Sequence, residues 1–269
     1  MIDLHAHLLP GLDDGPAGMP DAVAMARIAV EAGVRTAVCT PHMAERWPTT
    51  PAQVRAGVEA LGAELAREEI PLELRTGGEI AIPFLAGMTD EELAEATLGG
   101  GGRWLLVELR GGGWPLGLAE RIADLEIRGF GVVLAHPERA EFVQRAPDRL
   151  HDLVGRGALV QLNASSFTGD HGPRAQGTAV ALLRGGLGHF LATDAHSAAW
   201  RPPELNDGLQ AAARHLGVDA AALAWMVEDG PRLVMDGRPV RPPRLAPSRR
   251  ARPAAAPPAR RGRPRPTRR

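Results

Sequence analysis

The sequence has a single cysteine, Cys39, no lysine, and no apolar run near the roughly 20 residues that a membrane span needs. One cysteine cannot form a disulfide within the chain. The N-terminus lacks a basic segment before an apolar one, so no signal peptide is evident. A cysteine nucleophile in a loop closed by an arginine six residues further on is excluded, because position 45 holds Glu45. We therefore expect a cytoplasmic protein without a membrane span and without a thiol nucleophile.

The 31 basic residues are all arginines, and they are distributed unevenly. Residues 1–237 carry 19 arginines and all 32 acidic residues, a net charge of −13, whereas residues 238–269 carry 12 arginines and no acidic residue, a net charge of +12. An acidic body suits a site that collects cations. The segment 238–269 is also rich in proline and alanine, so we expect a folded domain over 1–237 and a disordered tail over 238–269.

Hydrophobic periodicity predicts that strands and helices alternate through the body. Strands are expected at 2–8, 34–40, 72–76, 103–109, 131–135, 158–163 and 189–193, and helices at 21–32, 51–69, 116–128, 147–155, 172–185, 203–216 and 219–228. This alternation indicates an α/β fold with a parallel sheet, most simply a barrel.

Residue types that bind metals follow the ends of these predicted strands. His5 and His7 are two apart, so both imidazoles can point to one face of the first strand, although such a pair alone is equally consistent with two surface histidines. Further candidates follow in the turn after that strand and at later strand ends: Asp14 (with Asp13 as the alternative), His42, Glu79, Glu108, His136, Asp194 and His196. The strand ends of a parallel barrel share one rim, so these side chains are expected to converge into a metal centre without thiolate ligands.

The motifs around these residues resemble the polymerase-and-histidinol-phosphatase (PHP) superfamily, and in particular the manganese-dependent bacterial protein-tyrosine phosphatases of capsule and exopolysaccharide clusters. The matching segments are Ile2-Asp3-Leu4-His5-Ala6-His7, Asp13-Asp14-Gly15-Pro16, Thr40-Pro41-His42, Gly77-Gly78-Glu79, Val107-Glu108, Ala135-His136-Pro137-Glu138-Arg139, Asn163-Ala164-Ser165-Ser166, and Thr193-Asp194-Ala195-His196 with Arg201-Pro202-Pro203. Glu108 stands where many superfamily members carry histidine, which makes the ordered set specific to this subgroup. The resemblance implies a distorted (β/α)7, TIM-like barrel followed by a disordered C-terminal tail.

The resemblance also implies a centre of three metal ions, Mn²⁺ with Fe or Zn²⁺ as alternatives. His5, His7, Glu79 and Asp194 would hold the first ion, Glu79 would bridge to a second that Glu108 and His136 complete, and Asp14, His42 and His196 would hold the third. A hydroxide activated by the metals would attack phosphorus. Arg139 and Arg201 would hold phosphate oxygens, and a surface salt-bridge role for both stays open.

The expected activity is hydrolysis of phosphotyrosine in proteins, with a tyrosine kinase of polysaccharide biosynthesis as the expected partner. One alternative is a small-molecule phosphatase, for example for histidinol phosphate, because the same metals would serve it. The other is a nucleic-acid-associated protein acting through its basic tail, which could contact anionic partners. Trp47 and Trp200 could flank an aromatic substrate ring or pack at the rim, and neither His171 nor His189 fits a ligand position. The sequence does not indicate an oligomeric state.

Overall fold

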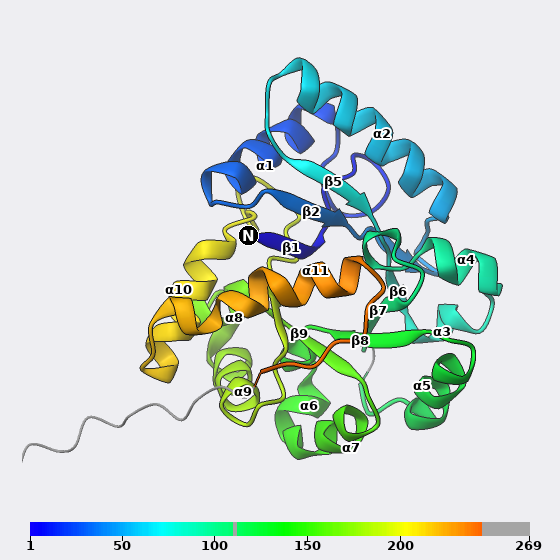
Figure 1. Ribbon diagram of the computed structural model, residues 1–269, viewed down its shortest axis with the longest axis vertical. Coiled ribbons are helices and arrows are strands. Elements are labelled where there is room, and N and C mark those ends of the chain that lie inside the picture. Colours follow the sequence, from blue (N-terminus) through cyan, green and yellow to red (C-terminus); the bar gives the residue numbers. More distant parts are fainter. Residues whose placement is uncertain (110–111, 244–269) are drawn as a thin grey trace, which may run out of the picture.

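The computed structural model describes residues 1–109 and 112–243 of the chain (Figure 1). Its strands are β1 (Ile2–Ala6), β2 (Thr36–Cys39), β3 (His42–Ala44), β4 (Trp47–Pro48), β5 (Glu73–Thr76), β6 (Glu79–Ala81), β7 (Trp104–Glu108), β8 (Gly131–Ala135), β9 (Leu159–Asn163) and β10 (Phe190–Ala192). The α-helices are α1 (Met19–Glu31), α2 (Pro51–Arg67), α3 (Ile82–Leu85), α4 (Asp90–Glu95), α5 (Leu118–Ile127), α6 (Glu141–Arg145), α7 (Leu150–Gly155), α8 (Ala164–Thr168), α9 (Gly172–Arg184), α10 (Leu205–Leu216) and α11 (Asp229–Met235). Four 3-10 helices complete the described part: η1 (Leu98–Gly100), η2 (Pro137–Arg139), η3 (Pro147–Arg149) and η4 (Ala220–Val227).

The strands form a distorted barrel from two sheets, ordered β1-β2-β5 and β10-β9-β8-β7-β6-β3-β4. Strand β2 leads into β3 and β5 leads into β6 after short breaks, so the chain passes from one sheet to the other at both places. A parallel bridge between Ala6 and Ala195 joins the two outer edges beside β1 and β10. The barrel therefore has seven strand positions, as predicted, and all pairs except the β3–β4 hairpin are parallel.

Two consecutive glycines make one of these breaks possible. A Cβ atom at Gly77 would lie 2.8 Å from Val38 Cγ1, and a Cβ atom at Gly78 would lie 2.6 Å from the end of the Met43 side chain. Only residues without a side chain allow the backbone to pass this closely. The pair thereby delivers Glu79 to the start of β6, opposite His42 in the register of β3.

The barrel interior is apolar at one end and polar at the other. Residues at the starts of the strands pack in one buried cluster: Ile2, Leu4, Val38, Trp104, Leu106, Val133, Leu159 and Phe190. Val234 of α11 belongs to the same cluster, and Trp104 Nε1 donates a 2.9 Å hydrogen bond to the Arg238 carbonyl oxygen. Since successive inward positions in a strand are two residues apart, the same strands carry Glu108 and Asn163 at their opposite ends. The C-terminal elements thus close the end of the barrel at which the strands begin, and the polar side chains lie at the opposite end.

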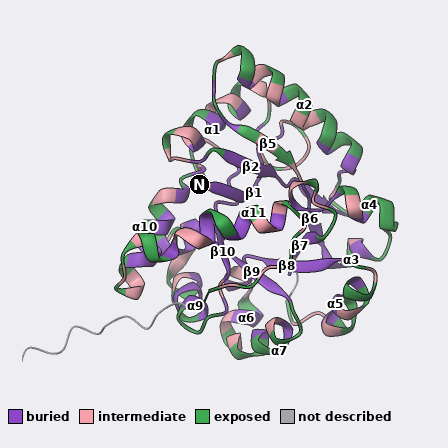
Figure 2. Ribbon diagram, in the orientation of Figure 1, coloured by how far each residue is buried: buried purple, intermediate pink, exposed green. Residues whose placement is uncertain are grey.

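The helices cover the outside of the barrel, and Figure 2 shows that their outward faces are exposed while most of the strands are buried, with β5 as a partly exposed exception. A second and larger apolar cluster fills the layer between strands and helices, with Met25, Leu61, Leu105, Val132 and Leu191 among its fully buried members. Helix α2 begins with Thr50 in a capping box with Gln53 and with Pro51 in the first turn. No helix within the described ranges has the length and apolar character needed to span a bilayer.

The predicted order of strands and helices is confirmed, with differences in detail. Residues 219–228 were expected to form an α-helix, but 220–227 form a 3-10 helix that Asp219 caps at the Ala221 amide. The short elements β3, β4, β6, α3, α4, α6, α8 and α11 have too few residues to show a period in the sequence. The disorder predicted for 238–269 falls mostly on residues outside the described ranges, because the structure describes this segment only as far as residue 243.

Candidate metal centre

The metal-type residues predicted from the sequence converge at the polar end of the barrel. They form three groups whose donor atoms lie within 4.8 Å of one another: His7, Asp14, His42 and His196; His5, Glu79, His136 and Asp194; and His42, Glu79 and Glu108. Nine residues that span the chain from position 5 to position 196 therefore share one site, and all except Asp14 and Glu108 are buried. Because His42 and Glu79 belong to more than one group, the three groups are continuous.

Four donor atoms at the centre have the spacing of a metal-binding set. His5 Nε2 and His7 Nε2 lie 3.2 Å apart, and each lies 3.3–3.6 Å from Glu79 Oε2 and Asp194 Oδ1. Ligands of a tetrahedral ion at about 2.1 Å would lie about 3.4 Å from one another. Two imidazole nitrogens and two carboxylate oxygens thus surround a common point, which is the arrangement that a divalent cation stabilises.

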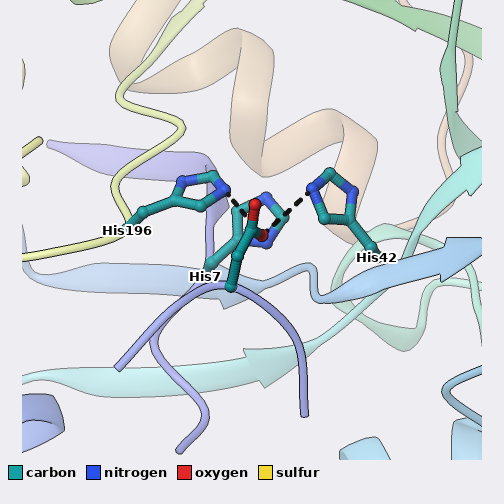
Figure 3. Close-up of side chains that lie close together, drawn as sticks. His7, His42 and His196 are labelled. Atoms are coloured by element: carbon teal, nitrogen blue, oxygen red, sulfur yellow. Dashed lines mark ion pairs between the residues drawn. The ribbon is translucent and has the colours of Figure 1, made fainter. Parts of the chain in front are cut away.

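A second set lies beside the first. Asp14 Oδ1 lies 3.4 Å from His42 Nε2 and 3.4 Å from His196 Nε2. Figure 3 shows His42 and His196 on opposite sides of this carboxylate, with the His7 ring behind it. Although burial favours the neutral acid, hydrogen bonds from His196 and His42 hold the pKa of Asp14 well below its usual range, so Asp14 is an anion here.

Asp13 lies next in sequence but faces a different set of partners. Its Oδ2 atom accepts a 2.6 Å hydrogen bond from His7 Nδ1 and a 2.9 Å bond from the His42 amide, and its Oδ1 atom accepts from the Gly15 amide at 2.9 Å. All three contacts hold protein groups in place. Asp14, and not Asp13, presents an oxygen to the ring nitrogens of His42 and His196.

Glu79 connects the remaining ligands. One carboxylate oxygen lies 2.8 Å from His136 Nε2 and the other lies 2.7 Å from His42 Nδ1, which itself lies 4.0 Å from Glu108 Oε2. Burial would raise the pKa of Glu79, but His5, His136 and His42 outweigh it and hold that pKa well below its usual range. A buried anion surrounded by imidazoles can bridge two cations.

The central imidazoles are held in fixed orientations by polar groups behind them. His5 Nδ1 lies 3.1 Å from Gln161 Oε1, His7 Nδ1 bonds to Asp13, and His196 Nδ1 lies 2.8 Å from the Asp194 carbonyl oxygen. Each of these acceptors bonds to Nδ1, so Nε2 is the ring nitrogen that faces the site. Hydrogen bonds to Asp13 and Glu79 outweigh burial and raise the pKa of His7 to about 9, so a cation bound at His7 Nε2 would replace a proton there.

Two ligand positions have an unusual backbone conformation. His136 has φ +28° and Asp194 has φ +53°, both in the region that favours glycine; His136 directly follows β8, and Asp194 lies two residues past the end of β10. Such a conformation costs about 1–3 kcal/mol per residue and persists only where surrounding contacts impose it. One such contact is the hydrogen bond from the His136 amide to Gln161 Oε1 at 3.2 Å.

Arg139 and Arg201 lie at the edge of the centre. Both contact Asp194 Oδ2, with Arg139 Nη1 at 2.6 Å, and Asn163 Nδ2 donates to the same oxygen at 3.0 Å. These three donors leave the other oxygen, Oδ1, facing His5 and His7. Burial and the neighbouring Arg139 lower the pKa of Arg201 to about 9, so its guanidinium group is charged at pH 7. Both arginines thus contact Asp194 at the edge of the centre.

Two cavities open beside these arginines. One, of about 510 Å³, is lined by both arginines with Ser165, His171 and Trp200, and exposed acidic residues lie on its wall. The other, of about 490 Å³, is lined by Arg139 together with Glu108 and His136. Arg139 therefore lies on the wall of both cavities.

Sequence reasoning missed Gln161, which lies behind the candidate ligands in a strand that resembles ordinary core; only its place on the inward face near the rim could have indicated a polar role. Asn163 belongs to a motif that carries the resemblance, but the sequence predicted no specific role for it. Cys39 is buried in β2 and burial raises the pKa of its thiol, which agrees with a core residue. His189 precedes β10 and accepts a hydrogen bond from the Val160 amide.

The two tryptophans lie on different sides of the centre. The Trp47 ring stacks on His42 with 4.9 Å between ring centroids, and Arg46 packs over its other face. Trp200 lies 6.0 Å from the His196 ring and is 66% exposed at the mouth of the larger cavity. Trp47 thus packs at the rim, whereas Trp200 remains available to a ligand.

Comparison with known proteins places the chain in a family. Residues 1–231 match the family model described as capsular polysaccharide synthesis, CpsB/CapC. The chain is 31% identical to the tyrosine-protein phosphatase YwqE of Bacillus subtilis strain 168, over 91% of this chain and 96% of that protein, and 27% identical to the tyrosine-protein phosphatase CpsB of Streptococcus pneumoniae, over 88% and 99%.

The fold agrees with the sequence match. The structure superposes with a TM-score of 0.80 and 29% identity on a solved structure from work on YwqE and CpsB, described as unique metal-dependent tyrosine phosphatases; the match covers 93% of this chain and 100% of that one. The ordered motifs that suggested this group from the sequence contain all nine residues that converge at the candidate centre. The chain belongs to the CpsB/CapC family of capsular polysaccharide synthesis proteins.

Proposed function

We propose that this protein is a metal-dependent phosphatase that removes phosphate from phosphotyrosine in proteins. The observation that carries the proposal is the position of two charged arginines, Arg139 and Arg201, on the rim of a continuous group of imidazole and carboxylate donors. Cations and guanidinium groups together match a phosphate dianion, since the planar fork of arginine donates two parallel hydrogen bonds. The two related phosphatases support tyrosine phosphate as the substrate.

The donor set fits divalent metal ions. It has imidazoles and carboxylates without a thiolate, and the 3.2–3.6 Å spacing of its central atoms suits a shared ion. We propose three Mn²⁺ ions, with Fe or Zn²⁺ as alternatives. His5, His7, Glu79 and Asp194 would hold the first, Glu79, Glu108 and His136 the second, and Asp14, His42 and His196 the third. Such ions supply Lewis acidity toward phosphoryl oxygens and lower the pKa of water.

The protein residues then have distinct tasks. Arg139 and Arg201 would orient the phosphate and neutralise the charge that develops during transfer, which requires them to share contacts between Asp194 and the substrate. Gln161 and Asp13 would keep the rings of His5 and His7 in one tautomer. The 510 Å³ cavity has room for an aryl group, and Trp200 at its mouth offers a ring for stacking.

The kinase partner and the tail extend this proposal. A tyrosine kinase of polysaccharide biosynthesis would supply the phosphotyrosyl protein, and the activity would lie in the cytoplasm, where a chain with one cysteine needs no disulfide. Residues 238–269, with a net charge of +12, would dock to anionic partners through charge. Chemistry would reside in residues 1–237, since the centre is built from positions 5 to 201.

The discriminating experiment compares two substrates on one preparation. We expect the Mn²⁺-loaded protein to hydrolyse a phosphotyrosyl peptide with a much larger kcat/KM than histidinol phosphate, and to lose both activities in a chelator. A preference for histidinol phosphate would favour the small-molecule phosphatase instead. Catalytic inactivity together with salt-dependent DNA binding that requires residues 238–269 would favour the nucleic-acid role.

A further inference from the structure

One histidine of the larger cavity belongs to none of the ligand groups. His171 immediately precedes α9, is half-buried, and lines the cavity together with Arg139 and Arg201. Its Nε2 atom lies 2.9 Å from Ser165 Oγ and 3.3 Å from Asn163 Nδ2. Asn163 also bonds to Asp194 Oδ2, so two hydrogen bonds separate the His171 ring from the oxygen that both arginines contact.

The contacts of His171 favour a proton on Nδ1. The Asp194 carboxylate can only accept hydrogen bonds, so the group of Asn163 that faces it at 3.0 Å is the amide nitrogen. That nitrogen lies 3.3 Å from His171 Nε2, and the Ser165 hydroxyl, which can donate, lies 2.9 Å from it, so an accepting Nε2 satisfies both contacts. A neutral imidazole that accepts at Nε2 carries its proton on Nδ1. Burial, with Arg139 and Arg201 next, lowers the pKa of His171 to about 3, which agrees with a neutral ring at pH 7.

The Nδ1–H group is free to bind a ligand. Within residues 1–109 and 112–243, no protein acceptor bonds to it, and the side chain does not cap α9. The cavity acids Asp170, Glu204 and Asp207 are exposed, whereas the two guanidinium groups lie on the side of the metal-type ligands. The first turn of α9, a 13-residue helix, has no acidic residue, so its positive dipole end adds to the field of the arginines.

We propose that His171 is a substrate-binding residue that donates a hydrogen bond from Nδ1 to an oxygen of the phosphoryl group held by Arg139 and Arg201. The inference rests on the proposed phosphatase function and adds a third donor to the phosphate site. A neutral imidazole suits this position, because a third full positive charge beside two guanidinium groups would be costly. The chain from Asp194 through Asn163 to His171 would couple the donor's orientation to the metal centre.

The test uses the two amide replacements of histidine, which mimic different ring nitrogens. His171→Asn places an amide nitrogen near the position of Nδ1, whereas His171→Gln places its amide near Nε2 and leaves no donor at Nδ1. Inorganic phosphate is titrated into each Mn²⁺-loaded full-length protein by calorimetry, and kcat/KM is measured on a phosphotyrosyl peptide. The exposed His151, changed to Gln, serves as the matched control.

We expect His171→Gln to weaken phosphate binding about tenfold, the usual effect of losing one hydrogen bond to a charged group, and His171→Asn to stay within about threefold of wild type. Metal content should be unchanged in both. Wild-type phosphate affinity in His171→Gln, equal weakening in both variants, or loss of metal would each overturn the proposal; if His171→Gln does not fold, His171→Ala takes its place. Phosphate binding needs no turnover, so a failure to hydrolyse phosphotyrosine would contradict the proposed function separately.

Discussion

The neighbouring carboxylates Asp13 and Asp14 should respond differently to the same substitution. Asp14 presents an oxygen to His42 and His196, whereas Asp13 fixes the His7 ring from behind and accepts two backbone amides. Asp14→Asn removes an anionic donor from a set of three side chains, so we expect one metal ion per chain to be lost. Asp13→Asn leaves every donor to the metals in place, so the ions should remain but bind more weakly.

The size of the Asp13 effect follows from its contacts. An asparagine side chain has one accepting oxygen, so the three donors that now face two carboxylate oxygens cannot all be satisfied. Changing the partner behind a metal-binding histidine typically lowers metal affinity tenfold to hundredfold. Leaving one buried donor unsatisfied should also cost about 1–3 kcal/mol of folding free energy.

Metal content after dialysis, Mn²⁺ titration and urea unfolding separate the two carboxylates. We expect Asp13→Asn to retain the wild-type number of ions at saturating Mn²⁺ and to need higher concentrations for half-saturation. Asp14→Asn should stay one ion short at any concentration tested, with a folded circular dichroism spectrum. If Asp13→Asn loses the ion and Asp14→Asn keeps it, the ligand assignment in this turn is reversed.

Three further perturbations test other parts of the structure. Arg139→Ala and Arg201→Ala should each lower kcat/KM on a phosphotyrosyl peptide about ten- to hundredfold with unchanged metal content, and lysine should restore only part; metal loss would instead assign the arginines to holding Asp194. Burial lowers the pKa of His189 to about 4, so the unfolded chain takes up a proton at a higher pH than the folded protein does. The chelated protein should therefore lose up to about 3 kcal/mol of its free energy of unfolding as the pH falls from 6.5 towards 4, measured by urea unfolding, and His189→Asn should lack this loss. A chain ending after Pro243 should keep kcat on p-nitrophenyl phosphate, and loss of that turnover with metals bound would place part of the active domain in the tail.

Much of the fold could be predicted because short segments of the sequence indicate where its strands and helices lie. Most of the predicted strands are apolar runs with a metal-type residue at or just past the C-terminal end, and Thr50 followed by Pro51 marks the start of α2. The convergence of the metal-type residues could be predicted because parallel strand ends share a rim, so His42, Glu79 and His136 come together without any knowledge of side-chain positions.

What the sequence could not provide depends on contacts between distant segments. Gln161 lies 156 residues from His5 in the chain, and no local pattern shows that it holds that ring. The positive φ angles of His136 and Asp194 could not be predicted from their residue types, because tertiary contacts impose them. The same holds for His171, which reads as a loop histidine until the barrel brings it beside the two arginines.

The measurement that tests the central proposal most directly is metal content per chain, determined together with phosphotyrosyl hydrolysis during a stepwise chelator titration. We expect activity to fall as ions leave the centre, to reach zero in the metal-free protein, and to return with Mn²⁺. Full hydrolysis of the phosphotyrosyl peptide by a metal-free preparation would contradict it.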